Sequence, residues 1–486
     1  MSSYFTDLAK QYIDGEWRPG TGSWDIINFN PYDGEKLASI TIAAVDEVDQ
    51  AYQAAARAQK EWAATNSYAR RVVFEKALRL VEEREKEITE VIIAELGGTH
   101  LKAGFELHLA KEFLRESIHL ALRPEGRIIP SPIDGKENRL YRVPVGVVGV
   151  ISPFNFPFLL SLKSVAPALA LGNGVVLKPH QNTPITGGTL IAKIFEDAGL
   201  PKGLLNVVVT DIAEIGDAFI EHPVPKVISF TGSDKVGRHV ATVCAAQFKR
   251  SVLELGGNSA IVVLDDADLD YAVDAAVFSR YVHQGQVCMA ANRVLVDRSI
   301  ADEFTEKFVA KVSSLKVGDP SDPQTVIGPV INTAQANAVS GVVEQAIAEG
   351  ATALLHGSTT DNLVEPSVLT DVPADSALLR QEVFGPVAFL IPFDGEQDAL
   401  RIVNDTPYGL SGAVHTGDIE RGVAFAKQVD TGMFHVNDGT VHDEPLVPFG
   451  GEKNSGIGRL NGETTLEAFT TQKWISVQHG RSQFPF

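Results

Sequence analysis

The chain has 486 residues, of which 44% are apolar and 21% charged. This is typical of a soluble protein with roughly two to four domains and excludes a disordered or fibrous one. The 62 Asp and Glu residues against 42 Lys and Arg give a formal charge of −20, which disfavours nucleic acid and membrane surfaces as partners. Two cysteines exclude a disulfide framework. Since neither a signal segment nor an apolar span of about 20 residues is visible, we predict a cytoplasmic protein.

The first 122 residues predict amphipathic helices. Apolar residues follow a helical period from Val45 to Ala55, and charge-rich amphipathic runs cover residues 69–96 and 103–122. Prolines and a glycine interrupt this period in residues 127–143. That segment is therefore predicted to form a β-hairpin or arm.

Short apolar runs alternate with amphipathic stretches from Val145 onwards. We predict strands at 145–151, 174–179, 204–209 and 226–230, and helices at 158–171, 184–198 and 234–246. A second series begins with a strand at 259–264 and helices near 268–282 and 299–313, and it continues to about residue 430. Strands that alternate with such helices form βαβ units and a parallel sheet. The predicted fold class is α/β, with two such domains in close contact.

Cys288 is a candidate nucleophile. It follows Gly285 in the segment HQGQVCMAANR, where small residues replace a regular apolar period, whereas Cys244 lies in a helical pattern. A lone cysteine is most simply a small buried side chain, and this is how we interpret Cys244. The loop setting of Cys288 favours a reactive thiol, which requires a lowered pKa or a nearby base.

Glu254 and Asn155 are candidate partners for such a nucleophile. Glu254 ends an apolar strand, where a carboxylate is either exposed or retained for proton transfer with a raised pKa. The glycines that follow, Gly256 and Gly257, favour a backbone that another group approaches closely. Asn155 stands among two prolines and three phenylalanines, either as a turn residue before a helix or as a donor to an oxyanion.

A phosphate site is expected where a strand ends and a helix begins. Gly232 and Ser233 follow the strand 226–230 and open a helix, although the spacing is not G-x-G-x-x-G. Lys178 ends another strand and either reaches ribose hydroxyls or a phosphate, or is simply solvated. No residues have convincing metal-ligand spacing, and the run His-Asp-Glu at 442–444 is interpreted as loop polarity. The G-x-S-x-G motif of α/β-hydrolases is absent.

In their order and spacing, these segments together resemble the aldehyde dehydrogenase superfamily from near residue 10 to the C-terminus. The matching segments are SPFNFP (152–157), LKP (177–179), FTGS (230–233), LELGG (253–257), GQVC (285–288), EVFGPV (382–387) and PFGGEKNSGIGR (448–459). Glu254 and Cys288 are 34 residues apart, as the family requires. Within the superfamily, residues 440–444 and the pair Cys288-Met289 resemble the vanillin, benzaldehyde and salicylaldehyde dehydrogenases.

The resemblance implies a covalent mechanism. Cys288 would attack an aldehyde and form a thiohemiacetal, while Asn155 and the Cys288 N–H would hold the oxyanion. Hydride transfer to a nicotinamide would leave a thioester, and Glu254 would activate the water that releases the acid. The cofactor would be NAD, with NADP tolerated because Gln181 stands where many NAD-preferring members carry glutamate.

The resemblance also implies two sets of binding residues. Cofactor contacts would come from Ser152, Phe154, Lys178, Gln181, Gly232, Ser233, Leu255, Glu382 and Phe384. The substrate pocket would include Phe156, Leu159, Val282 and Val287. No metal site is implied.

The same resemblance implies how the chain is divided. A Rossmann-like cofactor domain would comprise residues 1–123 and 145–256, and an α/β catalytic domain residues 257–455. A small β arm of residues 124–144 and 472–486 would build a homodimer or homotetramer. The implied reaction is NAD(P)-dependent oxidation of an aromatic aldehyde of the benzaldehyde or vanillin type. An aliphatic or semialdehyde dehydrogenase is the nearer alternative, and a cofactor-independent thiol hydrolase is the alternative from another class.

Overall fold

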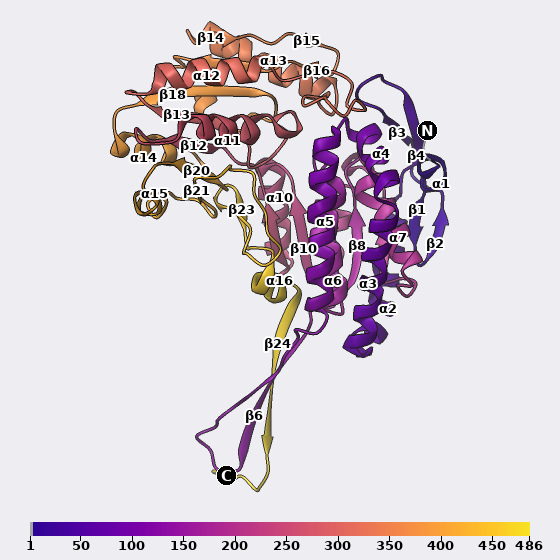
Figure 1. Ribbon diagram of the computed structural model, residues 1–486. Coiled ribbons are helices and arrows are strands. Elements are labelled where there is room, and N and C mark those ends of the chain that lie inside the picture. Colours follow the sequence, from indigo (N-terminus) through magenta and orange to yellow (C-terminus); the bar gives the residue numbers. More distant parts are fainter. Residues whose placement is uncertain (1–2) are drawn as a thin grey trace.

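In the computed structural model, which describes residues 3–486, the chain forms two large β-sheets flanked by helices (Figure 1). The first sheet has eight strands in the order β2-β1-β9-β8-β7-β10-β11-β23. Strands β7 to β11 are mutually parallel, while β1, β2 and β23 run antiparallel at the two ends. The bounds are β1 Gln11–Ile13, β2 Glu16–Arg18, β7 Val147–Ile151, β8 Gly174–Lys178, β9 Leu205–Val207, β10 Val227–Thr231, β11 Arg250–Glu254 and β23 Gly456–Ile457. The predicted parallel sheet is confirmed.

Helices cover both faces of this sheet. On one face α6 packs on β7 and β8 beneath an outer layer of α3, α4 and α5, and on the other face lie α2, α9 and α10. Alternate residues of β7 serve the two cores, because Val148 and Val150 belong to the first and Val147 to the second. The bounds are α1 Tyr4–Asp7, α2 Val45–Ala64, α3 Ser67–Glu83, α4 Glu85–Leu96, α5 His100–Leu120, α6 Pro157–Ala170, α7 Leu190–Asp197 after a π-helix at Ile185–Thr189, α8 Ile212–Ile215, α9 Ala218–Glu221 and α10 Asp234–Ala246.

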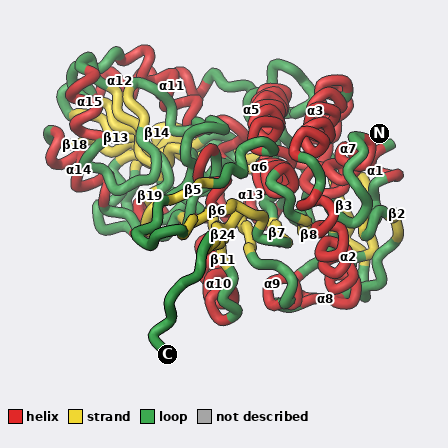
Figure 2. The backbone as a smooth tube through the Cα atoms, turned by 90° about the horizontal axis from the view of Figure 1, so that it is seen from below, coloured by secondary structure: helices red, strands yellow, loops and turns green. Residues whose placement is uncertain are grey.

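The second sheet has seven strands in the order β14-β17-β18-β13-β12-β20-β21, all parallel except β14. Figure 2 shows the strands of the two sheets as separate groups with helices outside them. The strands are β12 Ser259–Val263, β13 Ala291–Asp297, β14 Thr352–Leu355, β17 Ser367–Thr370, β18 Val387–Phe393, β20 Gly412–His415 and β21 His435–Val436. The helices are α11 Leu269–Tyr281, α12 Ala301–Ser313, α13 Thr333–Ala348, α14 Glu396–Asn404 and α15 Ile419–Ala426.

A three-stranded arm extends away from both sheets (Figure 1). It joins β5 (Arg127–Ile129) and β6 (Lys136–Pro144) to the C-terminal β24 (Thr470–Gln478), which pairs with β6 along its whole length. The hairpin predicted at 127–143 is thus present, and β24 begins two residues before the predicted arm segment 472–486. Helix α16 (Gly462–Phe469) leads into β24. The domain limits given above remain predictions, and β23 returns residues 456–457, beyond the predicted catalytic domain, to the first sheet.

Three small ladders complete the described strands: β3 (Asp25–Phe29) with β4 (Lys36–Thr41), β15 (Thr359–Thr360) with β16 (Leu363–Val364), and β19 (Tyr408–Gly409) with β22 (Glu452–Lys453). Within residues 3–486, no helix is long and apolar enough to cross a bilayer.

The chain passes from the first sheet to the second through four residues, 255–258, between β11 and β12. Both strands run parallel to their central neighbours. The carboxyl end of β11 and the amino end of β12 are therefore close together. This link brings the carboxyl edge of the first sheet to the amino edge of the second.

Gly149, in the middle of β7, permits close packing of α2 on the first sheet. A Cβ atom there would lie 2.6 Å from the Tyr52 hydroxyl and 2.8 Å from Ile228 Cδ1. We therefore expect Gly149→Ala to lower the free energy of unfolding by about 1–3 kcal/mol through overpacking. Gly104→Ala is the matched control, because a Cβ on this residue of α5 meets no atom within 4 Å and alanine favours a helix. Equal stability of the two variants in chemical denaturation would contradict the packing argument.

Candidate active site

Loops from the facing sheet edges bring the candidate residues together. After β7 come Ser152 and Asn155, and β8 and β11 end at Lys178 and Glu254. The second sheet contributes the segments that precede its strands, with Cys288 before β13 and Glu382 before β18. Carboxyl ends of parallel strands are the usual ligand edge of an α/β sheet. Here the amino edge of a second sheet supplies the remaining residues.

A cavity of about 550 Å³ lies at this junction. Its lining includes all nine residues for which we predicted cofactor contacts: Ser152, Phe154, Lys178, Gln181, Gly232, Ser233, Leu255, Glu382 and Phe384. Ser233 caps α10 by accepting the N–H of Val236, as expected for a helix that opens at a strand end. The structure thus gathers residues from position 152 to position 384 of the chain around one space. Their contacts with a cofactor remain a prediction.

Lys178 and Glu382, a base and an acid, both line this cavity. Burial lowers the pKa of Lys178, and no described residue accepts a hydrogen bond from its ammonium group. Burial also raises the pKa of Glu382 to about 7, while one of its oxygens accepts the N–H of Gly257 at 3.0 Å. A Cβ on Gly256 would lie 2.5 Å from this carboxylate, so the close approach predicted for the glycine pair is confirmed.

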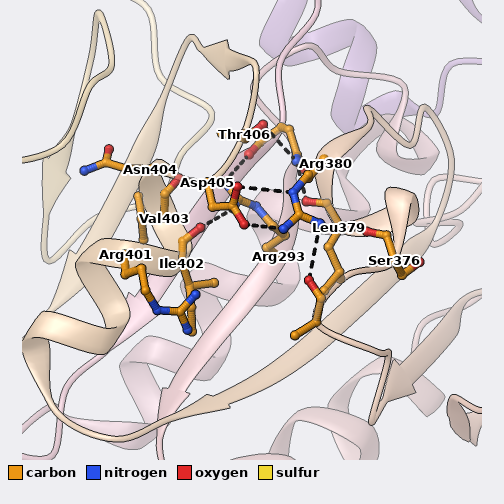
Figure 3. Close-up of polar contacts among 12 residues, drawn as sticks. Arg293, Ser376, Leu379, Arg380, Arg401, Ile402, Val403, Asn404, Asp405 and Thr406 are labelled. Atoms are coloured by element: carbon orange, nitrogen blue, oxygen red, sulfur yellow. Dashed lines mark hydrogen bonds and ion pairs between the residues drawn. The ribbon is translucent and has the colours of Figure 1, made fainter.

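A polar network holds the segment just before Glu382 (Figure 3). The Arg380 guanidinium faces Asp405 and forms an ion pair with it. Buried Arg293 donates to the carbonyl oxygens of Ile402 and Val403 at 2.7 and 3.1 Å, which joins β13 to the end of α14. This network fixes the chain just before Glu382 and the end of α14 beside it.

These features fit a dinucleotide. An ammonium group without a hydrogen-bond partner in the described residues and a carboxylate with one free oxygen match the hydroxyl and phosphate groups of such a molecule. Gly232, at the start of α10, presents backbone where a side chain would meet the ring of Phe230. The apolar walls at Phe154 and Phe384, whose rings are 5.8 Å apart, can cover a flat heterocycle.

A second, smaller cavity of about 40 Å³ adjoins the first. Five residues line both spaces: Asn155, Leu160, Thr231, Glu254 and Cys288. Three of the predicted pocket residues, Phe156, Leu159 and Val287, line the small cavity, but Val282 does not. Val282 directly follows α11 and packs into the core. The backbone changes direction only after it, at His283 and Gln284, which have positive φ.

Cys288 lies where the two cavities meet and retains partial exposure there. Burial, with smaller effects from Glu382 and Glu254, raises the pKa of its thiol to about 12. Without a ligand the sulfur is therefore a neutral thiol at pH 7, and attack requires a base. Cys244 is 1% exposed within α10, in agreement with its predicted structural role.

Glu254 is the carboxyl group that lines the same space. It is 6% exposed, and neither carboxylate oxygen has a hydrogen-bond partner among the described residues. Burial raises its pKa to about 8, and the positive charge of Lys163 counteracts part of this effect. A carboxylate with this pKa can accept and return a proton near neutral pH.

Asn155 reaches the segment before Cys288 from the other sheet. Its Nδ2 donates to the carbonyl oxygen of Gln286 at 3.0 Å, which leaves its second amide hydrogen available. No described residue accepts the backbone N–H of Cys288. Two donors near one sulfur are the arrangement that stabilises an oxyanion.

The backbone before Cys288 adopts an unusual conformation. His283, Gln284 and Gly285 all have positive φ, at 52°, 55° and 71°. Buried Arg280 braces this turn by donating to the carbonyl oxygens of Gly285, Val383 and Gly385. Two consecutive non-glycine residues with positive φ cost free energy, so the surrounding contacts must hold them.

The sequence analysis missed a buried ion pair in the small cavity. The Lys163 ammonium contacts the Asp443 carboxylate at 2.6 Å, with side chains 2% and 5% exposed. The interpretation of Asp443 as loop polarity is therefore wrong, because the loop 437–446 folds over α6 and buries it. The available signal was the single lysine in the apolar run 156–171, since a buried charge requires a partner.

The aldehyde dehydrogenase family profile matches residues 17–475. The chain is 59% identical to the benzaldehyde dehydrogenase YfmT of Bacillus subtilis over 482 residues, which are 99% of each chain. It is 45% identical to an NAD-dependent benzaldehyde dehydrogenase structure from Corynebacterium glutamicum, with a TM-score of 0.89 over 97% of this chain and 98% of that one. A salicylaldehyde dehydrogenase from Pseudomonas putida G7, solved with salicylaldehyde, is 35% identical with a TM-score of 0.94 over 98% and 99%. This chain belongs to the aldehyde dehydrogenase family.

Proposed function

We propose that this protein oxidises an aromatic aldehyde of the benzaldehyde type to its carboxylic acid, with NAD as the preferred cofactor. The observation that carries the proposal is the position of Cys288 between a large cavity suited to a dinucleotide and a small apolar cavity. The NAD-dependent benzaldehyde dehydrogenase from C. glutamicum, at 45% identity, supports both parts of it.

The first step forms a bond from the Cys288 sulfur to the aldehyde carbon. Glu254 takes the thiol proton, because no other base lies in the space shared by both cavities. The carbonyl oxygen becomes an oxyanion that accepts hydrogen bonds from Asn155 Nδ2 and the Cys288 N–H. The product is a thiohemiacetal on Cys288.

The nicotinamide supplies a hydride acceptor when the dinucleotide is bound, and Lys178 and Glu382 would hold its ribose. Loss of hydride converts the thiohemiacetal into a thioester on Cys288. Glu254 releases the thiol proton to solvent and, as a carboxylate again, removes a proton from a water molecule whose oxygen attacks the thioester carbon. The carbon–sulfur bond breaks, the acid leaves, and the thiol regains a proton.

The small cavity supports an aromatic ring as the group next to the aldehyde. Its walls are mostly apolar and include Phe105, Leu109, Phe156, Leu159, Val287, Met289, Val441, Phe449 and Leu460. Burial of a ring against such walls contributes about 25 cal/mol per Å² of apolar surface. Phe105 and Phe156 already form an edge-to-face pair, with centroids 6.1 Å apart.

A homodimer or homotetramer built through the arm belongs to the same proposal. The arm exposes apolar side chains that a second copy would cover, with Ile128 73% and Trp474 67% exposed. Sedimentation of the purified protein measures its assembly state. We also propose a cytoplasmic location, which the two unpaired cysteines support.

Steady-state kinetics with benzaldehyde and hexanal test the substrate class. We expect kcat/KM for benzaldehyde to exceed that for hexanal by at least about tenfold, because a rigid ring loses less conformational freedom than an alkyl chain when it packs against the pocket walls. Formation of reduced nicotinamide is the measured signal. Equal values would favour an aliphatic aldehyde dehydrogenase, and release of acid from an ester, with no reduced nicotinamide formed from either aldehyde, would favour a thiol hydrolase.

Glu254→Gln tests the roles of the base in the two steps. The amide keeps the shape of the side chain but cannot accept a proton, so release of the thioester should slow by about 10²–10⁴-fold. The Cys288 thiolate that forms slowly without the base still allows one turnover. Single-turnover kinetics should therefore show about one equivalent of reduced cofactor per site, formed more slowly than in the wild type and followed by little further turnover. If this first equivalent forms at the wild-type rate, Glu254 does not activate Cys288.

Gln181→Glu tests the cofactor preference. Gln181 lines the large cavity and carries no charge that would repel the 2′-phosphate of NADP. We expect activity with both cofactors in the wild type and a preference for NAD. Glutamate should raise the ratio of kcat/KM for NAD to that for NADP by about tenfold. The neutral control Gln181→Met should change the ratio by less than about threefold, and the same result for both variants would place selectivity elsewhere.

A further inference from the structure

Lys163 and Asp443 form the only ion pair in the lining of the small cavity within the described chain. Asp443 is held on its second oxygen by Asn461, whose Nδ2 donates at 2.8 Å. The carboxylate is thus fixed by the C-terminal part of the chain, and it fixes the lysine on α6. The mechanism given above uses neither group for bond formation.

The Lys163 ammonium has donor capacity to spare. One of its three N–H groups donates to a carboxylate oxygen of Asp443, and the ammonium also lies over the rings of Phe449 and Phe113, whose centroids are 3.5 and 5.2 Å away. No other hydrogen bond from this ammonium is present among the described residues. A buried N–H donor therefore remains for a further acceptor inside the cavity.

Lys163 lies on the face of α6 that lines the small cavity. Phe156, Leu159 and Leu160 precede it at helical spacing and line the same cavity. Asn155 lies two residues before α6, whose first residue, Pro157, is six residues or about 9 Å along the helix axis from Lys163. Helical side chains tilt towards the N-terminus, so the ammonium reaches back towards Asn155. A ring whose carbonyl oxygen meets Asn155 therefore has its distal edge directed at Lys163.

Stability does not explain an ion pair at this position. Apolar residues of similar volume are often at least as stabilising as a buried ion pair. The rest of the cavity wall is predominantly apolar. What Lys163 adds to such a wall is a hydrogen-bond donor of fixed position.

The cavity is smaller than an aromatic ring, since about 40 Å³ compares with about 150 Å³ for a cavity that binds benzene. Binding therefore requires lining side chains to rotate. Met289 has the flexible side chain suited to this and is 8% exposed. The Asn461–Asp443–Lys163 contacts remain the fixed polar point of the wall.

We propose that Lys163, positioned by Asp443, determines specificity by donating a hydrogen bond to an oxygen substituent on the ring edge opposite the aldehyde. The ligand class is a hydroxylated aromatic aldehyde, bound as the phenol or the phenolate. The inference rests on the proposed function and adds the substituent to it.

The test compares 4-hydroxybenzaldehyde with 4-methylbenzaldehyde, which matches its shape but has no acceptor. The preference is the ratio of kcat/KM for the hydroxyl substrate to kcat/KM for the methyl substrate. Because both values come from the same protein sample, the ratio does not depend on the fraction of active enzyme. Lys163→Met should lower the ratio of hydroxyl to methyl substrate by about tenfold or more. Lys163→Arg should keep the ratio within about threefold of the wild type, because it retains a charged donor.

Two further variants keep the test decisive. If the unpaired Asp443 prevents folding of Lys163→Met, the double variant Lys163→Met/Asp443→Asn removes the buried charge and should show the same loss of ratio. Lys193→Met is the matched control, because Lys193 lies on α7 outside both cavities, and its ratio should remain that of the wild type.

An unchanged ratio in Lys163→Met, together with a lower melting temperature, would overturn the proposal and assign the ion pair a structural role. Failure of the proposed function gives a different result. In that case the wild type would oxidise neither aromatic aldehyde faster than hexanal. This outcome does not depend on the ratio of kcat/KM between the hydroxyl and methyl substrates.

Discussion

The short link 255–258 is the constraint on which the site depends. It joins β11 to β12 without reversing the chain, so the carboxyl edge of one parallel sheet faces the amino edge of the other. Gly257 makes this approach possible, because a Cβ there would collide with the carbonyl oxygen of Cys288. Cys288 of one sheet and Glu254 and Asn155 of the other therefore share a single space.

Burial in that space has the same electrostatic effect on three groups. It raises the pKa values of Cys288, Glu254 and Glu382, to about 12, 8 and 7 respectively. Burial disfavours the charged form of each of these groups. Two lysines also line the cavities. Lys178 lies at the end of β8 in the large cavity, and Lys163 lies on α6 in the small one.

Rigidity of the reactive loop comes from buried polar contacts rather than from apolar packing alone. Arg280 ties the strained turn 283–285 to the segment 383–385, which also carries Phe384 into the large cavity. The Arg380–Asp405 pair holds the chain just before that segment, and Arg293 ties β13 to the end of α14 (Figure 3). The nucleophile and the cofactor-facing residues are thus parts of one connected framework.

The sequence by itself determined the α/β class, the arm and the residues at strand ends, because periodicity, glycine pairs and isolated polar residues are local properties. It also singled out Cys288, Glu254 and Asn155, which interrupt otherwise regular patterns. Only the tertiary structure decided that Val282 belongs to the core and that Asp443 belongs to the small cavity. The ion pair with Lys163 joins residues 280 positions apart, and no local pattern specifies which distant charge will neutralise a buried one.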